Sequence, residues 1–90
     1  MKSLHYSTKA KKDLKKYRNN LELMQALYAV LDLIVKGREI PSIFKPHKLF
    51  GNYKDCMECH VGNDFLLIWI DNETGSIEIV RIGSHSEIFK

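Results

Sequence analysis

The spacing of apolar residues changes once along this chain, and the change limits the folds that the sequence can adopt. Between residues 8 and 36 apolar side chains recur every three or four positions, which is the period of an amphipathic α-helix. After Gly51 they alternate with polar residues or fill short runs bounded by turn-forming residues, as in β-strands. Helices followed by a group of strands predict an α+β fold.

The N-terminal segment predicts a short strand followed by a basic helix. Residues 3–7 form a candidate edge strand. Ser7 or Thr8 can cap the helix that follows, because a hydroxyl oxygen accepts hydrogen bonds from the free N–H groups of the first turn. One apolar stripe of this helix, with lysines on its other faces, consists of Ala10, Leu14, Tyr17 and Leu21.

A second helix is predicted over residues 20–36, capped by Asn19 or Asn20 and packed antiparallel on the first. Pro41 and Pro46 follow in a segment that we expect to be irregular, because proline has no N–H group to donate to regular structure. His47 comes directly after this segment, so the sequence does not predict where His47 lies in the fold.

Three strands are predicted in the second half, over residues 53–61, 65–70 and 77–82. Short turn-forming connections join them, so we expect an antiparallel meander. The middle strand is apolar at every position, which places it at the centre of the sheet with the helices on one side. The expected architecture is one domain over residues 1–90: an N-terminal strand and a two-helix hairpin packed on a mainly antiparallel sheet, with a short C-terminal turn or helix.

Charge and hydropathy indicate the kind of partner and the compartment. The first twenty residues hold seven Lys or Arg against one Asp, and the remaining seventy hold seven against ten Asp or Glu. Lys and Arg neutralise phosphates, so a basic first helix favours a polyanionic partner, although a solvated helix face would give the same pattern. No apolar run approaches the ~18 residues of a membrane span, and the N-terminus does not resemble a signal peptide. We therefore expect a cytoplasmic protein without a membrane partner.

Cys56, Cys59 and His60 form a C-x-x-C-H sequence, which is the attachment motif of c-type haem. Haem of this kind is attached outside the cytoplasm, and the chain offers no obvious axial ligand. A zinc site would lack the second half of its ligand set. In a strand the two cysteines point to opposite faces, so we expect two buried thiols and neither a metal nor a cofactor.

Three of the four histidines stand where predicted strands begin or end. His60 precedes the turn that holds Asp64, and His85 follows Arg81 at the end of the last strand. Because imidazole has an unperturbed pKa of about 6.5, one ring can act as a base and another as an acid near neutral pH. Cleavage of RNA through its 2′-OH needs both, together with positive charge for the phosphate in transfer. A single histidine is more often structural, but this combination within half a small chain indicates a candidate site.

Three segments carry these residues in a fixed order: residues 47–51, 58–68 and 81–89. They resemble the motifs H-x-L-x-G, H-[IV]-x-P-D-W-L-L and R-x-G-[ST]-H-x-x-L-F of the YafQ branch of RelE-type toxins. The resemblance extends over the whole chain and includes the Lys-rich first helix. The chain departs from it at Met57, Asn63 and Phe65, where many relatives have Arg, Pro and Trp. The loss of that arginine removes one phosphate contact.

The resemblance implies a RelE-like fold and a metal-independent endoribonuclease that cuts mRNA on the 70S ribosome. It implies further that a cognate antitoxin inhibits the enzyme and that their complex binds operator DNA. Carried over by position, it implies catalytic roles for His47, His60, Asp64 and His85, with Asp64 orienting or stabilising a histidine. RNA contacts are expected from residues at the end of the last strand, at the C-terminus and on the first helix: Arg81, Phe89, Lys9, Lys11, Lys12 and Lys15.

A second class of function fits the same residues. The chain could be a non-catalytic binding module that keeps this fold and its basic face and acts as a corepressor with an antitoxin. The retained histidines and Asp64 favour the enzyme. Among the aromatic residues, Phe65 and Trp69 are expected in the core, and Phe89 is the candidate for stacking on a base.

Overall fold

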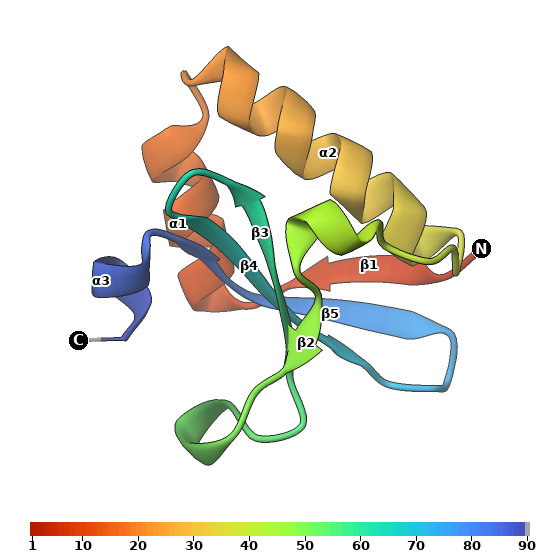
Figure 1. Ribbon diagram of the computed structural model, residues 1–90. Helices are drawn as coiled ribbons and strands as arrows, with labels where there is room; N and C mark the ends of the chain where they lie inside the picture. The colour runs from red at the N-terminus through yellow and green to blue at the C-terminus, as the bar shows by residue number, and fades with distance from the viewer. Residues whose placement is uncertain (90) are drawn as a thin grey trace.

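The computed structural model describes residues 1–89, in which two helices pack against one face of a five-stranded sheet (Figure 1). The strand order is β1-β5-β4-β3-β2, with β1 and β5 parallel and every other pair antiparallel. The predicted edge position of the N-terminal strand, the meander and the central strand are therefore confirmed. The strands are β1 (Ser3–Tyr6), β2 (His47–Lys48), β3 (Met57–Gly62), β4 (Phe65–Asp71) and β5 (Ser76–Gly83).

Both long helices begin at predicted cap residues. The Ser7 hydroxyl accepts a hydrogen bond from the Ala10 N–H at 3.0 Å and starts α1 (Thr8–Tyr17). The Asn20 side chain accepts from the Leu23 N–H at 3.2 Å and starts α2 (Leu21–Val35). Leu21 was expected in the apolar stripe of the first helix, but it opens α2 instead and is 73% exposed.

The two helices make their main contacts with different strands. α1 lies against β5, whereas α2 lies against β3, so each helix covers a different part of the sheet. Both helices contribute to the same buried cluster, with Ala10 from α1 and Leu27 from α2 among its members. In residues 1–89 no helix is both long enough and apolar enough to cross a membrane.

Two boundaries of the predicted sheet were wrong. β3 begins at Met57 and not at residue 53, because residues 51–53 form the 3-10 turn η2 (Gly51–Tyr53) and Asp55 has a φ of 70°, in the left-handed region. The segment around His47, which was expected to be irregular, forms the two-residue strand β2 beside β3 after the 3-10 turn η1 (Ser42–Phe44). The chain ends in the short helix α3 (His85–Ile88).

Buried side chains form two clusters, one on each face of the sheet. β4 contributes to both by alternation: Leu67 and Trp69 pack under the helices, and Leu66 and Ile68 pack on the opposite face. The second cluster is covered by residues from η2 and α3, which include Tyr53 and Ile88. We call this second side the open face, because neither α1 nor α2 covers it.

Leu67 tests the role of the central strand, because its side chain is fully buried beneath the helices. Leu67→Ala should lower the free energy of unfolding by about 2–5 kcal/mol, since it removes a buried side chain and leaves a cavity. Urea denaturation gives this value. The matched control is Leu21→Ala at the exposed start of α2, which should change it by less than about 0.5 kcal/mol. Equal losses in the two variants would contradict this account of the core.

Candidate functional site on the open face

The open face brings together two of the predicted histidines. Cys59 points into the cluster under the helices, so the alternation of β3 directs Glu58 and His60 to the open face. His47 on β2 lies opposite Glu58 in the strand register. The ring centroids of His47 and His60 are 6.3 Å apart. The edge strand β2 therefore places His47 beside His60.

His47 is held through both ring nitrogens. Nδ1 lies 2.7 Å from the carbonyl oxygen of Lys45, and Nε2 lies 3.0 Å from Oε1 of Glu58. A carbonyl only accepts hydrogen bonds, so Nδ1 must carry a proton. The contact between Nε2 and Glu58 joins two neighbouring strands, so it fastens β2 to β3.

Glu58 is a site residue that the sequence reasoning did not find. Its side chain is buried although it is an acid, and its Oε2 has no hydrogen-bond partner among residues 1–89. Buried acids are uncommon unless they are paired, and His47 pairs with Oε1 only, which leaves Oε2 as a buried acceptor at the site. The available signal was a glutamate inside a strand whose other residues are largely apolar.

His85 and Asp64 form a second group at the end of β5. His85 is the first residue of α3, and its backbone N–H donates to Oδ1 of Asp64 at 3.1 Å. Asp64 lies in the tight turn between β3 and β4, with a φ of 52°, a conformation that aspartate tolerates better than most residues. The contact of Asp64 thus runs to the main chain of His85, whereas a contact with an imidazole ring was expected.

The two groups stand on opposite sides of β4. His60 pairs with Leu66, and Leu66 pairs with Gly83, which comes two residues before His85. Two strand spacings correspond to about 10 Å between the outer backbones. Side chains that rise from both sides can therefore reach toward a group lying over β4.

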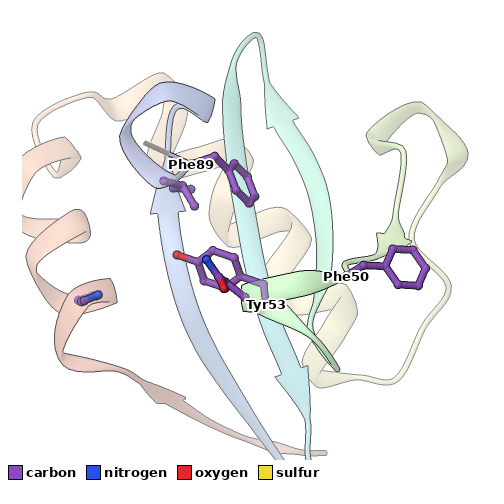
Figure 2. A pocket seen from close by; sticks show the side chains of 6 residues that line it. Phe50, Tyr53 and Phe89 are labelled. Atoms are coloured by element: carbon purple, nitrogen blue, oxygen red, sulfur yellow. The ribbon is translucent and has the colours of Figure 1, made fainter.

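Aromatic residues cover the same face (Figure 2). The Tyr53 and Phe89 rings meet edge to face with centroids 5.5 Å apart, and Phe89 lies 4.9 Å from the His85 ring. Phe89 remains 36% exposed, whereas Phe65 and Trp69 are buried as predicted. Beside Tyr53 and Phe89 is a hollow of about 470 Å³, whose other lining residues are Lys9, Phe50, Asn52 and Ile88. Tyr53 was expected in a strand, so its position beside Phe89 was not predicted.

Arg81, the predicted phosphate contact, is paired with an acid of α1. Its Nε and Nη2 donate to the Asp13 carboxylate at 2.9 and 3.2 Å, and the Ile82 N–H donates to the same carboxylate at 2.9 Å. The hydrogen bonds to Asp13 raise the pKa of Arg81 above its ordinary value. Arg81 therefore lies at the open face with part of its charge already neutralised.

Two of the four predicted lysines adjoin this ion pair. Lys9 and Lys12 line a hollow of about 400 Å³ together with Arg81 and Tyr53. Lys11 follows Lys9 by two residues, or about 200° of helical rotation, so it points away from the site. Lys15 lies one turn beyond Lys11 on that far side, and both are exposed.

The cysteines lie in different clusters, Cys56 under the open face and Cys59 under the helices, as predicted from strand alternation. Both are buried and free of disulfides. Burial, and then the nearby charge of Glu58, raises the pKa of Cys59 to about 12. Within residues 1–89 no three His, Cys, Asp or Glu side chains are grouped in a way that could hold a metal ion.

Comparison with known proteins agrees with this fold. The profile of the YafQ toxin, described as a bacterial toxin of type II toxin–antitoxin systems, matches residues 2–90. The mRNA interferase toxin YafQ of Escherichia coli K12 is 26% identical over 89 residues, covering 98% of this chain and 96% of that protein.

Solved structures give the same result. A metal-bound toxin from Helicobacter pylori superposes with a TM-score of 0.88 at 34% identity, covering 99% of this chain and all of that one. YafQ in the E. coli DinJ–YafQ toxin–antitoxin complex superposes with a TM-score of 0.86 at 26% identity, covering 99% and 98% of the two chains. The fold is thus RelE-like. The chain belongs to the YafQ family of bacterial toxins of type II toxin–antitoxin systems.

The ion pair between Asp13 and Arg81 can be tested by substitution. Asp13→Asn should lower the free energy of unfolding in urea by about 2 kcal/mol, because hydrogen bonds to charged groups contribute about 1.5–3 kcal/mol. The control is Asp32→Asn, which removes an exposed pair with Lys36 on α2 and should cost less than about 0.5 kcal/mol. If both variants lose the same small amount, the pair does not stabilise the open face.

Proposed function

We propose that the chain is an endoribonuclease that cuts mRNA on the ribosome and is neutralised by a cognate antitoxin. The observation that carries the proposal is the arrangement of His60 and His85 on either side of β4, on a face that neither long helix covers. Membership of the YafQ family supports it. So does the likeness to an E. coli protein named as an mRNA interferase.

The proposed reaction is attack of a ribose 2′-OH on the adjacent phosphate. One histidine takes the 2′-OH proton, and another protonates the departing 5′-oxygen, which leaves a 2′,3′-cyclic phosphate on the upstream fragment. We assign one of these transfers to His85 and the other to His60. His47 is less free to move a proton, because both its nitrogens already have partners, and we assign it to contact with the phosphate through its ring edge.

Asp64 acts in this scheme through the main chain of His85, which it holds at the start of α3. Side chains alone supply the acid, the base and the positive charge, so we propose that the reaction needs no metal ion. Chelation of metal ions with EDTA tests this proposal. A metal-dependent nuclease would lose activity, whereas this protein should keep its cleavage rate.

RNA would lie across the open face toward α1. Phe89 is 36% exposed beside His85 and can stack on an unpaired base, an interaction of about 1–3 kcal/mol. Phosphates along the hollow can be contacted by Lys9, Lys12 and Arg81. Lys11 and Lys15 lie on the far side of α1, so we assign them to ribosomal RNA.

The proposed antitoxin partner is supported by the E. coli DinJ–YafQ complex, whose toxin covers nearly the same length as this chain. From the resemblance to the toxin family we also propose that the antitoxin-bound complex binds operator DNA. A non-catalytic corepressor of this fold is the competing proposal. It predicts antitoxin and DNA binding without cleavage.

Substitution of the two histidines tests the proposed reaction. Induced wild-type protein should arrest growth, and primer extension should show cuts within translated reading frames. His60→Ala and His85→Ala should each reduce cleavage on purified programmed ribosomes by about 10²–10⁴-fold, the usual contribution of a general acid or base. EDTA should leave the wild-type rate unchanged, and mRNA without ribosomes should stay intact.

The matched control is His5→Ala. His5 is the fourth histidine, and it is exposed on the edge strand β1, outside the site. This variant should cleave like the wild type. If His85→Ala is as toxic as the wild type, the catalytic assignment is wrong. If the wild type binds antitoxin and operator DNA but cuts no message, the corepressor proposal is correct.

A further inference from the structure

The last helix is too short to hold its own position. α3 has only four residues, and isolated helices of fewer than about 12 residues are unstable in water. Yet His85 begins this helix and Phe89 follows it, so both depend on where α3 lies. Contacts with the rest of the protein must therefore fix it.

Glu87 makes most of these contacts. Its Oε1 accepts hydrogen bonds from the Ser84 N–H at 3.0 Å and the Ser84 hydroxyl at 2.9 Å, and also from the Tyr17 hydroxyl. Its Oε2 pairs with the Lys16 ammonium group. A capping box needs only Ser84 and Glu87. Lys16 and Tyr17 come from the end of α1, so the carboxylate ties the two helices together.

Tyr17 is itself fixed in place. Its ring meets Phe65 edge to face with centroids 5.0 Å apart, and Phe65 follows Asp64 in the chain. The Tyr17 hydroxyl donates to Glu87, and burial, followed by the nearby charge of Asp13, raises its pKa further above neutral. The tyrosine thus connects the carboxylate to the turn that holds the His85 main chain.

We propose that Lys16, Tyr17 and Glu87 form a latch that holds α3 on the open face and thereby positions His85 and Phe89. The inference rests on the proposed cleavage function. We assign the three latch residues as positioning residues, which act through the place of α3. Lys16 and Tyr17 lie outside the three motif segments, and Glu87 stands at an unspecified position of the third. The latch matters because a displacement of about 1 Å in a catalytic group can cost about 100-fold in rate.

Two variants test the latch, with amide hydrogen exchange and cleavage of ribosome-bound mRNA as measurements. Glu87→Ala removes the shared acceptor. Tyr17→Phe removes one donor and keeps the ring on Phe65, so it stays informative if the first variant is poorly folded. Glu39→Gln is the control, since it changes an exposed glutamate outside the site.

Glu87→Ala should speed exchange of the Ile88 and Phe89 amides, which are bonded to Ser84 and His85, by at least 10-fold, while amides of β4 stay protected. It should lower kcat by about 10- to 100-fold with little change in KM. Tyr17→Phe should show smaller effects in the same direction, and Glu39→Gln none. The pH–rate profile of Glu87→Ala should also change shape. If the variant merely contained less folded protein, the rate would fall by the same factor at every pH and the shape of the profile would not change.

The proposal is overturned if both variants keep α3 amide protection, or if they lose it and retain the wild-type kcat and pH profile. Failure of the cleavage proposal is distinct from these results. It would show as a wild-type protein that cuts no mRNA, and the exchange data alone would then decide whether Glu87 holds α3.

Discussion

Burial of β4 on both of its faces is the constraint on which the site depends. Leu67 packs under the helices and Leu66 packs under Tyr53 and Ile88, so the strand cannot shift by one residue without exposing one set of side chains. Its fixed register in turn fixes β3 and β5 on either side. His60 and the end of β5 therefore face each other across β4, and the open face receives polar residues from both neighbours.

The sequence predicted those helices and strands whose position depends on residues close together in the chain. Ser7 and Asn20 cap helices because of their own side chains, and the uninterrupted apolar run of β4 placed it at the centre of the sheet. β2 was missed because two residues have no period. The start of β3 was placed too early, since the left-handed backbone of Asp55 leaves no mark that hydrophobic patterning can detect.

The sequence identified individual candidate residues of the site, but it did not predict which of their side chains would be in contact. Motif order identified His60 and His85, whereas the partners of the charged residues depend on register and on contacts distant in sequence. Asp13 and Arg81 are separated by 68 positions. Glu58 meets His47 only because β2 pairs with β3 in one register. These pairings limit the free positive charge: Arg81 is partly neutralised and Met57 stands where relatives have arginine, so Lys9 and Lys12 become the main cations of the proposed RNA path.

The most direct test of the central claim uses the 2′-OH itself. Ribosomes programmed with an mRNA that carries a single 2′-deoxynucleotide at the cleaved position are incubated with the wild-type protein, beside an all-ribose mRNA. The proposed acid–base reaction predicts that the all-ribose message gives a fragment ending in a 2′,3′-cyclic phosphate and that the deoxy message stays intact at that position. Equal cleavage of the two messages would contradict attack by the 2′-OH and the roles assigned to His60 and His85.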